Sequence, residues 1–359
     1  MNVVNRIDSL KQAAFKEGKL DALLIFNSAN LIYLTGFTGA SALLIPKEGE
    51  NTIYVHNVNY EQAKVEGKVF RVELVKRNEN PMAKIAKQMK GFKIKNLALD
   101  ALSIEDWYAL AKEAKGEIKL KAQRNVVCEL RKVKDENEIA LMRKASALTG
   151  EGMRVAYETV ASGVREYEVA AEIEYAMRKQ GSYGTAFETI VASGSCSAFP
   201  HGGCSEKEIR KGDLVVVDIG ATYKFYRSDM TRTLVAGEPS EKQTKLHQTV
   251  KTAQEKAFEA IKANVKARDV DAVARKILAD AGYGKYFVHS LGHGVGLEVH
   301  EPPILGPDSK DTLTAGNVVT VEPGIYLVGY GGVRIEDTVL VHKDGAQKLT
   351  NGPYTLGEE

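Results

Sequence analysis

Residues 213–235, DLVVVDIGATYKFYRSDMTRTLV, contain two apolar β-type runs on either side of a polar turn. A similar stretch, NVVTVEPGIYLVGYGGVRIEDTVLV, recurs at residues 317–341. In each stretch one acidic residue ends the first run and another lies at the second run. The succession of strand and turn signals predicts two β-hairpins, and each hairpin carries a pair of carboxylates.

The first hairpin is expected to bring its acids face to face. If its turn lies at Tyr223 and Lys224, Asp218 on one strand is directly opposite Asp229 on the other. Residues opposite each other in an antiparallel pair have Cβ atoms about 4.5–5.5 Å apart, and like charges there repel. The apolar run before Asp218 predicts a buried strand, in which an uncompensated carboxylate is costly.

The second hairpin repeats this arrangement, because symmetry about Gly329 places Glu322 opposite Glu336. One acid in a strand is commonly a solvent-facing residue or an ion-pair partner. Two matching pairs instead favour bound cations, and four carboxylates would balance two divalent ions. Oxygen-rich ligands with one imidazole favour Mn, Co or Fe over a thiolate-type zinc site. Two ions about 3.5–4 Å apart that share a hydroxide form a hydrolytic centre.

Residues 290–301, SLGHGVGLEVHE, supply two candidate histidines, His293 and His300. A helix would align them, but each glycine in it costs about 1 kcal/mol, and a strand would point them to opposite faces. Glycine allows close backbone approach and a bend, which would direct both rings into one cavity. His289 lies beside them in the sequence. Two histidines in polar contexts are expected at the surface: His247 and His342.

The hairpins are parts of a diverged internal repeat. A helix pair ending at residues 165–181 precedes a small-residue stretch with FPHGG and then the first hairpin. Helical patterns at residues 242–261 and 269–282 precede the histidine segment and the second hairpin. In this alignment His201 of FPHGG falls near His300. The repeat predicts a domain of two similar halves.

Residues 1–125 have a different pattern of apolar and polar residues. Short apolar strands alternate with amphipathic helices that end at glycine, which predicts an α/β domain with its own core. The charged stretch at residues 126–134 is expected to be a linker. Asp135 followed by Glu138 resembles a capping box at the start of a long helix, so the second domain is expected to span residues 135–359. The fold class is therefore α/β, or α+β, in two domains.

Composition limits the classes of function. A chain of 359 residues predicts two domains, and 44% hydrophobic with 27% charged residues is typical of a soluble globular protein. A net charge of +2 favours neither nucleic acid nor a membrane surface as a partner, and no apolar run is long enough for a membrane helix. Three cysteines without a CxxC pair favour a reduced, cytoplasmic setting.

These features together resemble the creatinase and methionine aminopeptidase superfamily, the pita-bread metallopeptidases, and within it the Xaa-Pro dipeptidase (prolidase) and aminopeptidase P branch. NLIYLTGFTGASALLI at residues 30–45 is similar to the creatinase-like N-terminal α/β domain of that branch. LGHGVGLEVHE, TVEPGIY and GGVRIEDT are similar to segments of its pita-bread domain, which has a pseudo-twofold internal repeat. The resemblance implies a dinuclear-metal-dependent peptidase that hydrolyses the bond between an N-terminal residue and proline by attack of a metal-bridging hydroxide.

The resemblance also implies a role for each matching residue. The metal ligands would be Asp218, Asp229, His293, Glu322 and Glu336. Asp229 and Glu336 would bridge two divalent ions. Asp218 would hold one ion, and His293 with Glu322 the other. Glu322 would also carry the proton to the leaving proline nitrogen. Mn or Co is expected, with Fe or Zn as alternatives, and the family implies a homodimer.

Other matches imply contacts with the substrate. His201 and His300 would stabilise the tetrahedral intermediate and hold the scissile carbonyl. His289 would line the pocket for the proline side, and Arg334 would brace the metal-site end of the substrate cleft. Thr231 would contact the metal ligands, without binding the ions itself, and so orient them.

One departure concerns the carboxylate of a dipeptide substrate. In many prolidases an arginine shortly after the second histidine clamps this group, and this chain has Ile304 there. The leading expectation is an Xaa-Pro dipeptidase, and the alternative is an Xaa-Pro aminopeptidase that acts on longer peptides. A non-catalytic binding protein of the same fold is a remote alternative, because such relatives tend to lose ligands and all five are present here. The expected substrate is thus an Xaa-Pro dipeptide or a short proline-containing peptide.

Overall fold

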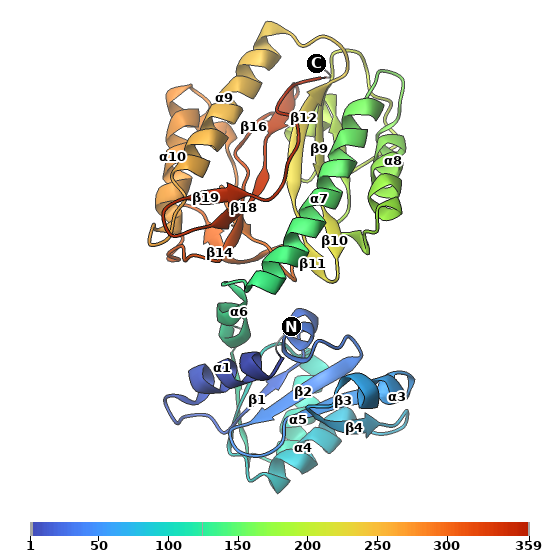
Figure 1. Ribbon diagram of the computed structural model, residues 1–359, viewed down its shortest axis with the longest axis vertical. Helices are drawn as coiled ribbons and strands as arrows, with labels where there is room; N and C mark the ends of the chain where they lie inside the picture. The colour runs from blue at the N-terminus through green and yellow to red at the C-terminus, as the bar shows by residue number, and fades with distance from the viewer. Residues whose placement is uncertain (1–2, 124, 358–359) are drawn as a thin grey trace. The chain divides into compact units, whose positions relative to one another are not determined.

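The computed structural model describes residues 3–123 and 125–357, and the chain divides into two compact units, residues 1–131 and 132–359 (Figure 1). Helix α6 (Asn125–Arg131) occupies most of the segment expected to be a linker. Within the described residues no helix combines the length and the apolar character that a membrane span needs.

The N-terminal unit is built on one six-stranded sheet in the order β4-β3-β2-β1-β5-β6. Its strands are β1 (Ala22–Ile25), β2 (Ala40–Pro46), β3 (Thr52–His56), β4 (Arg71–Val75), β5 (Asn96–Leu99) and β6 (Lys119–Ala122). Its helices before α6 are α1 (Val3–Phe15), α2 (Ser28–Thr35), α3 (Asn57–Glu66), α4 (Pro81–Gly91) and α5 (Ile104–Ala114). All four residues of β1 are buried, so both faces of the sheet are covered, as an α/β unit requires. The predicted α/β architecture is confirmed.

The C-terminal unit contains two helix pairs on opposite sides of its strands (Figure 1). The first half comprises α7 (Glu136–Thr159), α8 (Glu166–Lys179), β7 (Gly184–Thr185), β8 (Ile190–Ser193), η1 (Gly194–Ala198), β9 (Leu214–Ile219), β10 (Ala221–Tyr223), β11 (Tyr226–Arg227) and β12 (Met230–Val235). The second comprises α9 (Glu241–Glu259), α10 (Ala267–Asp280), η2 (Gly284–Tyr286), β13 (Gly292–Gly294), β14 (Glu301–Leu305), β15 (Val318–Val321), β16 (Gly324–Leu327), β17 (Gly331–Arg334), β18 (Asp337–Val341) and β19 (Ala346–Lys348).

Each half of this unit has its own apolar core. One core joins α7 and α8 to β9 and β12, and the other joins α9 and α10 to β15 and β18. The strand orders are β12-β9-β8 in the first half and β14-β13-β15-β18-β19 in the second, with smaller sheets β11-β10-β7 and β16-β17. Both halves therefore place a helix pair against a long hairpin, which confirms the predicted repeat.

The first hairpin has a different register from the one expected. Asp218 is opposite Thr231 rather than Asp229, so the predicted face-to-face pair is wrong. The reason lies in the turn, where Lys224 and Phe225 both adopt positive φ, at 44° and 75°. A turn centred one residue later shifts the pairing by two positions. Because side chains alternate with a period of two, the two acids still share one face of the hairpin.

The second hairpin has the expected register. Val321 pairs with Asp337 and Gly324 pairs with Arg334, which places Glu322 and Glu336 opposite each other between these pairs. Gly329 lies at the turn with a φ of 82°, a conformation that glycine adopts without steric cost.

A buried ion pair joins the two hairpins. Nη2 of Arg232 lies 3.0 Å from Oδ1 of Asp337, and both side chains are almost completely buried. Nη1 of Arg232 also donates to the carbonyl oxygens of Thr231 at 2.9 Å and Glu336 at 2.6 Å. Removing one member of such a pair typically costs about 3–5 kcal/mol, because the other charge is left buried. Arg232 therefore fixes the strands that carry acids from both halves.

Two further expectations concern α7 and the remote histidines. Asp135 accepts a hydrogen bond from the Glu138 N–H at 2.8 Å, and Glu138 accepts one from the Asp135 N–H at 3.0 Å, so the capping box is confirmed. His342 is exposed, as expected. His247 is buried, which contradicts the expectation, because the face of α9 that carries Leu246 and Val250 turns inward.

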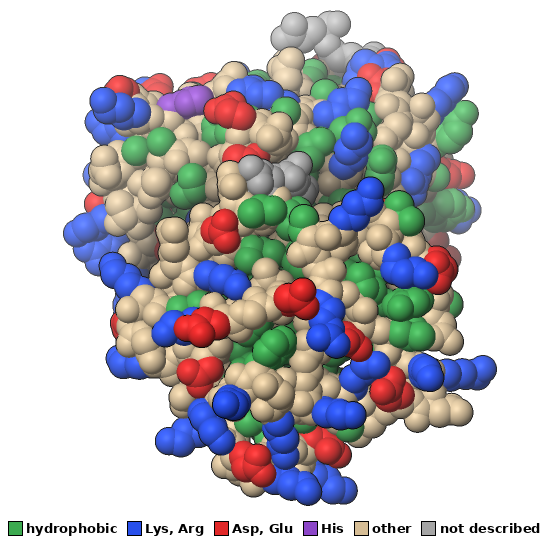
Figure 2. All heavy atoms as spheres, turned by 60° about the horizontal axis from the view of Figure 1, so that its bottom comes forward, with side chains coloured by type: hydrophobic (Ala, Val, Ile, Leu, Met, Phe, Trp, Pro, Cys, Tyr) green, Lys and Arg blue, Asp and Glu red, His purple; other side chains and the backbone are tan. Residues whose placement is uncertain are grey.

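On the face drawn in Figure 2, acidic and basic side chains are interspersed rather than gathered into a patch of one sign.

Candidate metal centre and active site

The four acids come from the ends of strands in both hairpins. Asp218 lies on β9, and Asp229 directly precedes β12. Glu322 directly follows β15, and Glu336 lies between β17 and β18. The Glu336 N–H donates to the carbonyl oxygen of Thr231 at 3.0 Å, so the backbones of the two hairpins meet at the acids.

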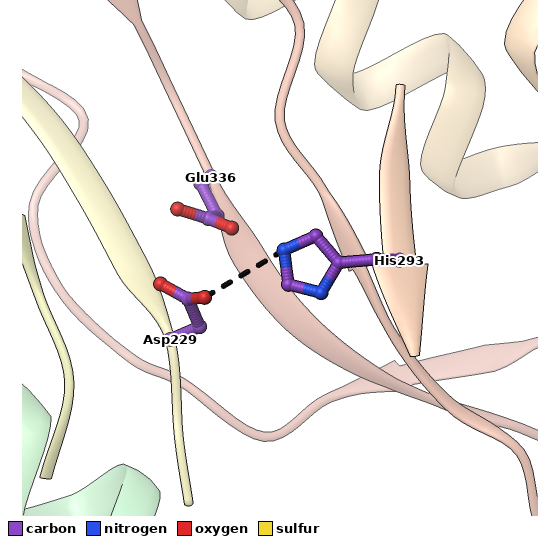
Figure 3. A group of neighbouring side chains, drawn as sticks. All are labelled: Asp229, His293 and Glu336. Atoms are coloured by element: carbon purple, nitrogen blue, oxygen red, sulfur yellow. Dashed lines mark ion pairs between the residues drawn. The ribbon is translucent and has the colours of Figure 1, made fainter. Parts of the chain in front are cut away.

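His293 faces these acids from β13. Its Nε2 lies 3.2 Å from Oε1 of Glu322 and 3.8 Å from Oδ2 of Asp229. Its Nδ1 lies 3.1 Å from the carbonyl oxygen of Gly294, which fixes the ring and leaves Nε2 as the ligand atom. Figure 3 shows Asp229, His293 and Glu336 converging, and one ligand atom from each lies within 4.8 Å of the others.

The donor set fits a divalent cation. Oδ1 of Asp218 and Oε1 of Glu336 are buried and have no hydrogen-bond partner within the described part of the chain. Burial raises the pKa of Asp229 well above its ordinary value, and the negative charge of Glu336 raises it further. Burial together with the charge of Glu322 does the same for the pKa of Glu336. A bound cation would remove this penalty and occupy the free oxygens.

The glycines of SLGHGVGLEVHE allow close packing in this part of the fold. A Cβ on Gly292 would overlap the carbonyl oxygen of Thr320, and one on Gly294 would overlap the carbonyl oxygen of Pro302. The strand pairing shifts register after His293, and the rings of His293 and His300 meet with centroids 4.2 Å apart. Both histidines therefore serve one cavity.

All the candidate site residues except Thr231 line a single cavity of about 960 Å³ in the C-terminal unit. They are Asp218, Asp229, His293, Glu322, Glu336, His201, His289, His300 and Arg334, and Ile304 lines the same cavity. Burial lowers the pKa of His300, and the neighbouring His293 lowers it further. Glu322 has the opposite environment: burial opposes ionisation, but the hydrogen bond and charge of His293 lower its pKa to about 2.

Arg334 is buried and all three of its nitrogens are occupied. Nη2 pairs with Oδ2 of Asp218 at 2.7 Å, and Nε donates to Oγ1 of Thr231 at 3.1 Å. Nη1 donates to the hydroxyl of Tyr326 at 2.9 Å and to the carbonyl oxygen of Pro200 at 3.3 Å. Arg334 therefore holds the ligand strands and has little capacity left for a substrate.

Tyr326 is a site residue that sequence reasoning missed. Its hydroxyl bonds Nε2 of His289 at 2.9 Å as well as Arg334. Nδ1 of His289 lies 2.8 Å from the carbonyl oxygen of Ser290 and must donate to it, so Nε2 accepts the proton of Tyr326. Both nitrogens of His289 are used, and the residue offers the cavity a ring surface. Tyr326 lies in β16, four residues after Glu322, and this even spacing was the available signal.

Comparison with known proteins identifies the family. Residues 140–343 match the model described as metallopeptidase family M24, and residues 6–133 match the creatinase/prolidase N-terminal domain. The chain belongs to metallopeptidase family M24. Members of a metallopeptidase family act with bound metal ions, so the M24 assignment agrees with the donor set found here.

Similar M24 proteins extend over the whole chain. A protein from Pyrococcus horikoshii named Xaa-Pro dipeptidase is 42% identical over 336 residues, which cover 93% of each sequence. The solved structure of an Xaa-Pro dipeptidase from Bacillus anthracis has a TM-score of 0.94 and 36% identity, and covers 99% of both chains. The structure of an X-Pro aminopeptidase from Thermotoga maritima has a TM-score of 0.85 and 39% identity, and covers 94% of this chain and 97% of its own. The fold of this M24 protein, an α/β domain followed by a pita-bread domain, is thus the one expected from its sequence.

Proposed function

We propose that this protein is a metal-dependent Xaa-Pro dipeptidase. The observation that carries the proposal is the convergence of acids from both hairpins with His293 on one cavity. Two carboxylate oxygens there have no hydrogen-bond partner among the described residues. The substrate class is supported by relatives named Xaa-Pro dipeptidase that match at 42% identity over 93% of the chain.

The five ligands would hold two divalent ions. Asp229 and Glu336 would bridge both ions, Asp218 would hold one, and His293 with Glu322 would hold the other. Mn or Co is proposed because the donors are mostly carboxylate oxygens with one imidazole. Bound ions would supply a water nucleophile active at neutral pH and would polarise the scissile carbonyl.

The remaining residues orient the peptide and move protons. Glu322 would pass a proton from the nucleophile to the proline nitrogen, a role that needs a carboxylate within reach of both. His201 and His300 would donate to the oxygen on which charge develops. His289 would bound the space for the proline ring with its ring surface, because both of its nitrogens are engaged.

A second candidate is an Xaa-Pro aminopeptidase that acts on longer peptides. The observation that favours it is Ile304, which lines the cavity and lies opposite His293 in the β13–β14 pair. Among the described lining residues the one permanent cation is Arg334, which is already paired with Asp218. A free carboxylate beside proline would therefore lack a charge-assisted partner.

Hydrolysis rates with Mn or Co separate these functions. An Xaa-Pro dipeptide, the matching Xaa-Pro-Yaa tripeptide and an Xaa-Ala dipeptide are compared before and after chelation. Cleavage of the dipeptide that requires proline and disappears with chelator supports the dipeptidase. A higher kcat/KM for the tripeptide would favour the aminopeptidase, and no cleavage of either proline peptide with metal bound would refute both.

Two further proposals concern the setting of the enzyme. We propose a homodimer, as the sequence resemblance implies, and light scattering at several protein concentrations tests it. A reducing cytoplasm is proposed because the three cysteines include no CxxC pair and their odd number does not suit a disulfide framework. Fractionation of the source cells tests the location.

A further inference from the structure

Helix α10 carries an ion pair that contacts the wall of the cavity. Nε and Nη2 of Arg275 donate to the carboxylate of Asp271 at 2.8 and 2.9 Å. The Asp271 side chain is 1% exposed and that of Arg275 is 30% exposed. The two residues are four positions apart and lie on neighbouring turns of the helix, with the fork geometry of a bidentate pair.

The same two side chains hold the backbone of residues 287–291. Arg275 donates from Nη1 to the carbonyl oxygen of Phe287 at 3.2 Å and from Nη2 to that of His289 at 3.0 Å. Oδ1 of Asp271 accepts the N–H of Leu291 at 3.0 Å. We name Asp271 and Arg275, with these three backbone contacts, the α10 clasp. The clasp thus fixes both ends and the middle of a five-residue segment.

The held segment leads directly to the active site. The guanidinium carbon of Arg275 lies 4.3 Å from the ring centre of Phe287, and that ring packs edge-on against His289 at 5.1 Å. The carbonyl oxygen of Leu291 accepts the N–H of Glu322 at 2.8 Å. Two sets of contacts therefore position His289: the α10 clasp holds its backbone, and the hydroxyl of Tyr326 binds its ring.

A helical ion pair that served stability alone would not need these contacts. Lys276 and Asp280, on the same helix at the same spacing, form an exposed pair with side chains 74% and 65% exposed. Such exposed pairs contribute little to stability. The α10 clasp differs because its donors and acceptors are used on the segment that carries His289.

We propose that Asp271 and Arg275 are positioning residues that set the wall against which the proline ring of the substrate packs. This inference rests on the proposed Xaa-Pro function, because it assigns His289 to the proline side of the cavity. The wall contacts the ring in the ground state and in the transition state alike. Loosening it should therefore raise KM and leave kcat nearly unchanged.

The experiment uses the metal-loaded full chain with Arg275→Met, and Lys276→Met as the matched control. R275M should raise KM for an Xaa-Pro dipeptide about fivefold, with kcat within about twofold of wild type and unchanged metal content. K276M should match wild type. In a His289→Ala background R275M should add less than about twofold to KM, because residues that act through one another are not additive. Arg275→Lys should give an intermediate KM.

Hydrogen exchange of residues 287–291 supplies a readout that does not depend on turnover. R275M should speed exchange in this segment about tenfold relative to K276M. A lower kcat with unchanged KM and a lower Tm would mean a purely structural role and would overturn the proposal. Additive effects of R275M and H289A would also overturn it.

Two further experiments distinguish a failure of the α10 clasp proposal from a failure of the proposed function. If R275M does not fold, Asp271→Asn keeps an acceptor for Leu291 and should show the same rise in KM. If the wild type cleaves no Xaa-Pro peptide, the proposed function fails. The α10 clasp is then tested by hydrogen exchange alone. An unchanged exchange rate of residues 287–291 in R275M or D271N rejects it.

Discussion

Oγ1 of Thr231 lies 2.6 Å from Oε2 of Glu336 and 3.1 Å from Nε of Arg334. A guanidinium only donates, so Thr231 accepts from Arg334 and gives its own proton to Glu336. One oxygen of Glu336 is thereby fixed, and Oε1 is left without a hydrogen-bond partner in the described structure. The hydroxyl of Thr231 thus holds Glu336 in a geometry in which the free oxygen can bind a metal ion.

Thr231→Val should weaken binding of Mn or Co by about tenfold or more, because it removes the hydrogen bond that orients a proposed bridging ligand. Calorimetric titration of the metal-free protein measures the effect. Thr149→Val is the matched control, since Thr149 is buried in α7 and its hydroxyl bonds backbone groups at Ala145 and Ala221. Equal affinities of T231V and T149V would show that the hydroxyl does not support the site.

His293 and His300 should separate metal binding from turnover. His293→Ala removes the imidazole that faces Glu322 and Asp229, so metal content should fall. His300→Ala should leave the metal bound and lower kcat by about 100-fold, the usual size of a lost contact to the developing oxyanion. Metal analysis beside steady-state kinetics makes the comparison. If both variants lost metal equally, the assigned division of roles would be wrong.

Ile304→Arg should shift the enzyme towards substrates with a free carboxylate. Ile304 is 39% exposed and lines the cavity, so an arginine there can reach a dipeptide's terminus. KM for an Xaa-Pro dipeptide should fall about tenfold relative to the uncharged Xaa-Pro amide, the size of one charge-assisted bond. Ile304→Leu controls for the change in shape. An identical change for dipeptide and amide would contradict the electrostatic explanation.

His247 should make the protein less stable in mild acid. Burial lowers its pKa from 6.5 to about 4, and the nearby charges of Lys251 and Arg232 act in the same direction. The unfolded chain therefore binds this proton more readily than the folded one. The contribution of neutral His247 to the free energy of unfolding is fully present above about pH 6.5. It is lost as the pH falls towards 4, and the total loss is about 3 kcal/mol.

Urea unfolding at several pH values measures this loss in wild type and in His247→Gln. The variant should lose less stability over the same pH window, and the exposed His342→Gln should follow wild type. Parallel pH profiles of wild type and H247Q would reject the assignment to His247.

The two hairpins show how far local sequence determines this fold. Gly329 adopts a positive φ, as glycine readily does, and the second register follows from symmetry about it. In the first hairpin Lys224 and Phe225 adopt positive φ although their side chains disfavour it, so no residue type in the sequence marks the position of this turn. The strands, the repeat and the alternation of faces were predictable, but this turn was not.

Tertiary contacts account for the other differences. His247 has a polar sequence context, and only the packing of α9 against the strands buries it. Arg275 and Asp271 look like an ordinary helical pair, because their contacts with residues 287–291 depend on how α10 docks. The four proposed acidic ligands were identifiable because acids in buried strands are costly, and the apolar runs beside them indicate burial in the sequence itself. Positioning groups such as Tyr326 carry no comparable signal.

The ion pair between Arg334 and Asp218 joins positions 116 residues apart, and the hydrogen bond between Thr231 and Glu336 spans 105. Contacts of this separation contribute only after a long loop has closed. Metal uptake should therefore report that both halves have met, and neither hairpin alone would retain the ion. At a free metal concentration 100 times Kd, binding would add about 2.7 kcal/mol to global stability. Metal supply would then govern how long the chain survives proteolysis as well as how fast it works.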